Sequence, residues 1–246
     1  MSVIVLVGGS FLGAWVWEKV TPTLQAAGHE VYPLTLTGAG DRAHLASTST
    51  TLNLNADDIV HAIEYADLRE VILVGHSYGA APATIAASRI PDRIARIVYI
   101  AGVLPAPGRT LFEQSGAEVE GAIMQSVDAD GDGWLIPVMS DFILDAVFGE
   151  HGLTTEDRAY LRARGTGQPV SIYRAPAPAD LSAVEKLART YVVCAGDPGD
   201  PTIKPGAPGF DVETLDSGHW PMITRPEALA EVISRWAERG VGTLSR

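Results

Sequence analysis

A serine between two glycines is the feature of the sequence that most directly suggests chemistry. Gly75-His76-Ser77-Tyr78-Gly79 fits the pattern G-x-S-x-G, with the apolar run EVILV before it and the small residues AAPATIAA after it. A serine on a sharp turn between a strand and a helix has strained backbone angles, so its neighbours two places away must be small. The N-terminus of the following helix favours a developing anion. We therefore predict that Ser77 is a nucleophile, the alternative being that the glycines only let a strand and a helix pack closely.

A serine hydroxyl is a weak nucleophile and needs a base, which in turn needs a group that orients it. Of the six histidines, His219 follows the last predicted strand, in TLDSGHWPM, and precedes the final predicted helix. In hydrolases with a G-x-S-x-G turn on a parallel sheet, the acid and then the histidine follow the serine along the chain. His219 fits this order as general base and then general acid, whereas His76, inside the serine motif, is expected to be structural.

Two carboxylates follow the predicted strand TYVVCAG and could orient the histidine. They are Asp197 and Asp200, in GDPGDPTIKP. We predict Asp200, because an acid a few residues beyond the strand end can turn back toward His219. Asp197 remains the alternative acid.

Hydrolysis of an acyl group also needs backbone N–H donors for the oxyanion that forms. One donor is expected from Tyr78, the residue after the nucleophile, and the other from the loop after the first strand, VGGSFLGAW. In that loop Ser10 is the best placed residue and Phe11 the second. A dinucleotide-binding loop is a weaker interpretation, because the G-x-G-x-x-G spacing is missing.

Strands and helices alternate along most of the chain. The predicted strands are nearly continuous apolar runs at 3–7, 31–36, 70–75, 96–102, 190–196 and 210–215, and the predicted helices lie near 15–27, 55–66, 78–89 and 225–239. Runs of this kind are typical of parallel strands covered on both faces. We predict an α/β fold with a doubly wound, mostly parallel sheet of about six strands.

The alternation is interrupted once. Residues 105–180 contain no strong strand pattern, and we predict that they form a small helical lid inserted between two strands of a core made of residues 1–104 and 181–246. The apolar side chains of this segment either line a substrate pocket or form the segment's own small core. The predicted pocket residues are Trp134, Met139, Phe142 and Phe148, together with Trp220 after the histidine.

Composition excludes several classes of function. The formal net charge is −12 with only three lysines, so a phosphate-binding basic face is missing and neither nucleic acid nor an anionic membrane is an expected partner. No apolar run approaches the ~18 residues of a membrane span. The single Cys194 excludes an intrachain disulfide. We expect a cytoplasmic protein, and the sequence does not indicate an oligomeric state.

A metal site is not expected either. The acidic stretch from Asp128 to Gly133 is similar to the start of a calcium-binding loop, but its twelfth position is Met139, where such loops carry a bidentate glutamate. We interpret the stretch as an acidic turn.

With these residues in place, the chain resembles the α/β-hydrolase superfamily over most of the sequence outside the insertion. The stretch GAWVWEKVTPTLQAAGHEVYPLTLTGAGDR further resembles the branch of plant methylesterases, hydroxynitrile lyases and bacterial pyrethroid-hydrolase-like esterases. The resemblance implies a compact sheet, a small helical lid, no cofactor and a Ser-Asp-His triad on Ser77, Asp200 and His219. The lyases of this branch carry a lysine just after the histidine and a threonine in the oxyanion loop. This chain has Trp220 and Gly9 there, which argues against cyanohydrin cleavage.

The sequence thus predicts a serine hydrolase that cleaves apolar or aromatic carboxylic esters or lactones through an acyl-enzyme on Ser77. Two alternatives stay open. A lyase or cyclising enzyme would use the same triad for acid–base catalysis without an acyl-enzyme. A ligand receptor would keep the fold but not the turnover.

Overall fold

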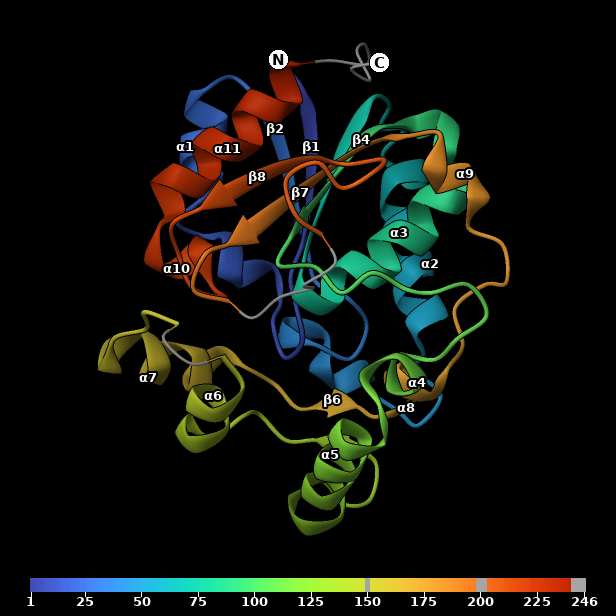
Figure 1. Cartoon of the computed structure of the whole chain (residues 1–246), viewed down its shortest axis with the longest axis vertical. Coiled ribbons are helices and arrows are strands. Elements are labelled where there is room, and N and C mark those ends of the chain that lie inside the picture. The colour runs from blue at the N-terminus through green and yellow to red at the C-terminus, as the bar shows by residue number, and fades with distance from the viewer. Residues whose placement is uncertain (149–150, 198–202, 240–246) are drawn as a thin grey trace.

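A six-stranded parallel sheet forms the centre of the molecule in the computed structural model, which describes residues 1–148, 151–197 and 203–239 (Figure 1). The strands are β1 (Val3–Val7), β2 (Glu30–Leu34), β3 (Val71–His76), β4 (Ile94–Ile100), β7 (Ala188–Cys194) and β8 (Asp211–Leu215). They pair in the order β2-β1-β3-β4-β7-β8, and every pair is parallel. The predicted doubly wound sheet is confirmed.

The two central strands, β3 and β4, show why apolar runs in the sequence predicted a sheet covered on both faces. Every residue of β3 and β4 is buried, as expected for strands with helices on both faces. One face packs against α1 (Thr21–Ala26) and α11 (Pro226–Glu238), and the other against α2 (Leu52–Tyr65), α3 (Ala80–Arg89) and α9 (Ser182–Glu185). Figure 1 shows these helices on opposite sides of the sheet.

The strand order reverses between β1 and β3. The chain moves from β1 outward to β2, then returns to place β3 on the other side of β1. Val7 at the end of β1 is in register with Gly75 near the end of β3, so the loops after both strands emerge side by side. Open α/β sheets bind their ligands at such a switch point, beyond the carboxyl ends of the strands.

Proline divides one of the predicted helices and marks the start of another. In place of one helix over 15–27, the chain forms a 3-10 turn, η1 (Ala14–Trp17), and then α1, with Pro22 in its first turn. The last predicted helix is likewise preceded by α10 (Pro221–Thr224), and α11 begins at Pro226. Proline lacks an N–H and is accommodated at a helix start, so it marks where a new helix begins.

Residues 105–180, which we call the inserted segment, are mainly helical. They contain α4 (Leu111–Ser115), α5 (Ala117–Asp130), α6 (Asp141–Phe148), α7 (Thr155–Arg164) and α8 (Ser171–Arg174). They also contain two strands that the sequence did not predict, β5 (Leu135–Ile136) and β6 (Gln168–Pro169), which pair antiparallel. Two residues are too few to give a periodic pattern. In Figure 1 the helices α5, α6 and α7 gather beyond the end of the sheet to which the arrowheads of β7 and β8 point.

Candidate active site

Ser77 lies on the turn between β3 and α3 in a left-handed backbone conformation, with φ of 51°. Non-glycine residues rarely adopt this conformation unless their surroundings hold them in it. The glycines on either side allow the turn: a Cβ at Gly75 would lie 2.7 Å from Ala80 Cα, and one at Gly79 would lie 2.4 Å from the carbonyl oxygen of Gly8. The close approach of backbone to backbone therefore explains the G-x-S-x-G pattern.

A continuous chain of hydrogen bonds links Ser77 to a carboxylate. Ser77 Oγ lies 3.0 Å from His219 Nε2, and His219 Nδ1 lies 2.8 Å from Asp197 Oδ2. The Asp197 carboxylate accepts the Nδ1 proton, so Nε2 carries the lone pair and accepts the serine proton. The side chains of His219 and Asp197 are 8% and 4% exposed, so water screens this pair weakly. The arrangement can take a proton from Ser77 and stabilise the imidazolium that results.

Two loops at the carboxyl edge of the sheet hold the histidine and the acid together. The loop after β7 is tied to the loop after β8 by bonds from Ala195 N to Leu215 O and from Gly196 N to Ser217 O, both 2.9 Å long. Asp197 N closes a turn onto Cys194 O at 3.0 Å. The loops are thus joined main chain to main chain just before their functional side chains.

This geometry bears on the choice between the two candidate acids. The structure brings Asp197 to His219, whereas Asp200 lies outside the described residues. The turn that directly follows β7 already points a carboxylate at the histidine, so no longer excursion of the chain is required. Main-chain hydrogen bonds hold Asp197 in this place, and a local sequence pattern does not indicate such bonds.

His76 is buried beside the candidate triad. Its Nε2–H donates to the carbonyl oxygen of His219 at 2.8 Å, and the two rings lie 4.9 Å apart between centroids. Burial, and secondarily the nearby His219, lower the pKa of His76 to about 3. A neutral His76 supports the main chain of His219 without opposing a positive charge on the His219 ring.

The loop after β1 passes directly over Ser77. A Cβ at Gly9 would lie 2.9 Å from both Ser77 Cβ and His76 Nδ1, so the loop can come this close only with glycine there. Ser10 Oγ lies 3.0 Å from the hydroxyl of Tyr173, and the Phe11 N–H donates to Gln168 Oε1 at 3.2 Å.

Tyr78, which follows the serine, is anchored from its side chain. Its buried hydroxyl donates to Asn55 Oδ1 at 2.8 Å. Asn55, Gln168 and Tyr173 escaped the sequence analysis. Nothing in the local pattern marks a polar residue as the partner of a segment far away in the chain.

The predicted pocket residues separate into several groups. The Phe148 ring lies 4.2 Å from the His219 ring and 4.8 Å from the Trp220 ring, between centroids. Met139 is half-buried between the main core and a smaller core of the inserted segment. Trp134 is half-buried, and its carbonyl accepts from Val170 N at 2.9 Å. The side chain of Phe142 lies outside what the structure describes.

The inserted segment also packs tightly against the histidine loop. A Cβ at Gly218 would lie 2.2 Å from the carbonyl oxygen of His151, so the residue before His219 must be glycine for the two backbones to meet. His151 and Trp220 are in edge contact, with centroids 5.8 Å apart.

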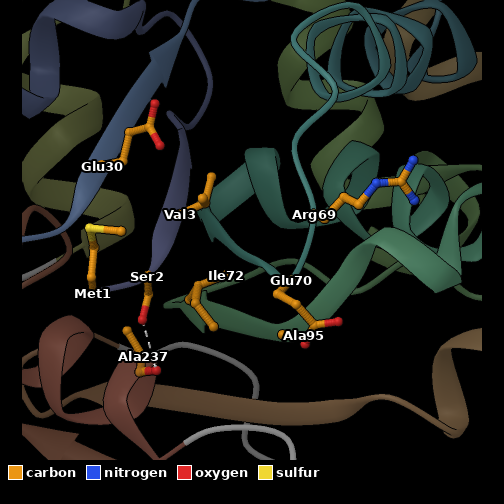
Figure 2. Close-up of a pocket in the computed structure, with 9 residues that line it drawn as sticks. All are labelled: Met1, Ser2, Val3, Glu30, Arg69, Glu70, Ile72, Ala95 and Ala237. Atoms are coloured by element: carbon orange, nitrogen blue, oxygen red, sulfur yellow. Dashed lines mark hydrogen bonds between the residues drawn. The ribbon is translucent and has the colours of Figure 1, made fainter.

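A hollow at the opposite end of the sheet offers no comparable chemistry. Figure 2 shows its lining, which includes Ser2, Val3, Ile72 and Arg69, at the amino ends of β1 and β3. Ser2 Oγ donates to Ala237 O at 3.1 Å, and Arg69 pairs with an exposed aspartate. Ligands of open α/β sheets bind at the carboxyl ends of the strands instead.

Among the described residues, no helix has the length and apolar character required to cross a membrane.

Comparison with known proteins shows the family of the chain. A sequence model described as "Alpha/beta hydrolase family" matches residues 4–232. The chain belongs to this family. It is 30% identical to the carbendazim hydrolyzing esterase of Nocardioides sp. (strain SG-4G) over 248 residues, which cover 95% of this chain and 99% of that protein.

Solved structures share the fold. An extracellular alpha/beta-hydrolase from a Paenibacillus species superimposes with a TM-score of 0.81 at 22% identity, over 96% of this chain and 99% of the other. A methylesterase from Arabidopsis gives a TM-score of 0.75 at 23% identity, over 97% and 100% of the two chains.

Proposed function

We propose that this protein is a carboxylic-ester hydrolase with Ser77 as nucleophile, His219 as general base and acid, and Asp197 as the orienting acid. The observation that carries the proposal is the chain of bonds from Ser77 Oγ to His219 Nε2, 3.0 Å, and from His219 Nδ1 to Asp197 Oδ2, 2.8 Å. The left-handed conformation of Ser77 and the similarity of the whole chain to an esterase support it.

In the acylation half-reaction, His219 Nε2 takes the proton of Ser77 while Oγ attacks the ester carbonyl carbon. The carbonyl π electrons move to oxygen, and the tetrahedral intermediate collapses as His219 protonates the departing alcohol. Asp197 stabilises the imidazolium in between. In the second half-reaction, His219 takes a proton from water as the water oxygen attacks the acyl carbon. The resulting intermediate collapses, the bond between the acyl carbon and Ser77 Oγ breaks, His219 returns the proton to Oγ, and the carboxylic acid is released.

The oxyanion is held by backbone N–H groups in this proposal. Tyr78 N–H supplies one, at the start of the turn that leads into α3. Ser10 N–H supplies the other, in preference to Phe11, because the Phe11 N–H already donates to Gln168 Oε1. Losing one such donor lowers turnover by about 10²–10³ in other hydrolases.

The substrate of this proposal is a neutral ester with an apolar or aromatic group, and the inserted segment acts as a lid. Phe148 and Trp220 place aromatic surface against His219, and Met139 lies between the two cores. The hydroxyls of Ser10 and Tyr173 add a neutral polar pair beside the oxyanion loop. Lactones fit the same mechanism. Location in the cytoplasm stays a prediction from composition.

A panel of p-nitrophenyl and methyl esters and lactones tests the proposal, with kcat/KM measured for wild type, Ser77→Ala and His219→Ala. Hydrolysis of apolar esters by wild type, reduced at least ~10³-fold in both variants, is the expected result. Equal rates in wild type and Ser77→Ala would rule out Ser77 as nucleophile.

A further inference from the structure

Phe11 has a backbone conformation that its surroundings must hold in place. Its φ is 69°, in the left-handed region, where a residue with a side chain is disfavoured by about 1–2 kcal/mol. Phe11 lies two residues beyond Gly9, at which a Cβ would be 2.9 Å from Ser77 Cβ. The conformation at Phe11 therefore decides how the neighbouring amides of this loop are aimed relative to Ser77.

Both backbone polar groups of Phe11 are bound by the last part of the inserted segment. The N–H donates to Gln168 Oε1 at 3.2 Å, and the carbonyl accepts from Thr166 N at 3.1 Å. The adjacent Ser10 is held through its side chain, with Oγ 3.0 Å from the Tyr173 hydroxyl. Three contacts from an eight-residue stretch thus hold two consecutive residues of the loop.

Of the two bonds to the Phe11 main chain, a substitution can remove the one from Gln168, because the other comes from the main-chain N–H of Thr166. Gln168 is 5% exposed, and the pairing of β6 with β5 sets its backbone opposite Ile136. Without its acceptor, the Phe11 N–H would be buried and unsatisfied, which favours a different backbone conformation. The peptide next to the Ser10 amide would then lose its anchor.

We propose that Gln168 is a positioning residue for ester hydrolysis, which aims the Ser10 N–H at the oxyanion by holding the N–H of Phe11. The inference rests on the proposed function. Because the oxyanion exists only after Ser77 has attacked, Gln168 contributes to the transition state and little to binding of the ester in its ground state.

An aryl trifluoromethyl ketone reports on this contribution directly. Ser77 Oγ adds to its carbonyl carbon, the π electrons move to oxygen, and the serine proton passes to His219, so the bound hemiketal carries the oxyanion. Its inhibition constant depends on the aim of the donors, whereas KM for an ester depends on the uncharged carbonyl.

The variants are Gln168→Met, of similar length but without the acceptor, and Gln168→Asn, which keeps an amide that is one methylene too short. The matched control is Gln114→Met. Gln114 Oε1 also accepts from a backbone N–H of the inserted segment, Ala106 N at 2.9 Å, but not from the loop over Ser77. Thermal melting of all variants separates lost stability from lost positioning.

We expect both Gln168 variants to lower kcat about tenfold and to raise the inhibition constant of the ketone by a similar factor, with KM within about twofold. A tenfold loss of kcat is smaller than the loss of about 10²–10³ expected for removing an oxyanion donor outright, because the Ser10 N–H is still present in these variants. Gln114→Met should leave all three constants near wild type.

Gln168 variants that bind the ketone as tightly as Gln114→Met would overturn the proposal. If the ketone still inhibits wild type strongly, that outcome overturns only the role of Gln168 and leaves the hydrolase mechanism intact. Wild type that neither hydrolyses esters nor binds the ketone would instead contradict the proposed function itself.

Discussion

His76 provides a quantitative prediction about stability and pH. Its ring is buried and donates from Nε2 to the His219 carbonyl, and among the described residues Nδ1 has no hydrogen-bond partner. A second proton would have to sit on Nδ1, buried and unpaired. This is the physical reason why burial lowers the pKa of His76 from 6.5 to about 3.

The sign follows from proton binding in the two states. Between pH 6.5 and about 3, the unfolded chain binds a proton at His76 that the folded chain does not. The free energy of unfolding therefore falls as pH decreases through this window, and the contribution is fully present above pH 6.5. The slope is about 1.4 kcal/mol per pH unit, and the whole effect is ~5 kcal/mol.

The perturbation that isolates this effect is His76→Gln, whose side-chain N–H can still donate to the His219 carbonyl but does not titrate. We would measure urea unfolding by tryptophan fluorescence at several values from pH 7.5 to 5.0. The free energy of unfolding of the wild type should fall by about 2 kcal/mol more than that of the variant across this range, because the range extends ~1.5 pH units below pH 6.5. His44→Gln, at an exposed position, is the control for loss of an imidazole.

Carboxylates contribute equally to both curves, so only the difference between wild type and His76→Gln is interpreted. If the free energy of unfolding fell equally with pH in wild type and His76→Gln, the assignment of a neutral buried His76 would be refuted. A curve for His44→Gln that follows wild type is expected.

Two further substitution pairs test the assignment of the acid and the packing of the turn that carries Ser77. Asp197→Asn should lower kcat by about 10³–10⁴ through loss of the oriented His219 tautomer, while Asp200→Asn stays within a few-fold of wild type; the reverse order in steady-state kinetics would restore Asp200 as the acid. Gly79→Ala should destabilise the fold by at least ~2 kcal/mol in urea, because its Cβ would lie 2.4 Å from Gly8 O. Gly121→Ala, in α5 with open space around the added carbon, should stabilise it by about 0.5–1 kcal/mol, and equal effects of the two would contradict the packing argument.

Much of the fold was predictable because its signals are local. β3 and β4 are buried at every position and therefore read as nearly continuous apolar runs, interrupted in β4 by Arg96, which is buried and pairs with Asp211. Ser77 directly follows β3 and His219 lies in the loop after β8, where the carboxyl ends of a parallel sheet converge. Their types and order along the chain were enough to pair them.

The parts that escaped prediction depend on contacts between distant segments. Sequence left Asp200 and Asp197 open as the acid, and the preference for Asp197 in our proposal rests on hydrogen bonds that join the chain after β7 to the end of β8 and its loop, which no periodicity encodes. Gln168 meets Phe11 across 157 positions of sequence, from a strand of two residues. Aromatic residues of the inserted segment look alike in sequence, yet Phe148 contacts His219 while Phe112 lies in a small cluster that the segment shares with Phe11.

Intact-protein mass after treatment with a small fluorophosphonate is the decisive test of Ser77 as an activated nucleophile. An activated serine displaces fluoride and gains one phosphonyl group, which requires both the Ser77 hydroxyl and a base at His219. We expect a single adduct on wild type that peptide mapping places on Ser77, and none on Ser77→Ala or His219→Ala in the same time. An unmodified wild type, or an adduct that persists in Ser77→Ala, would contradict it.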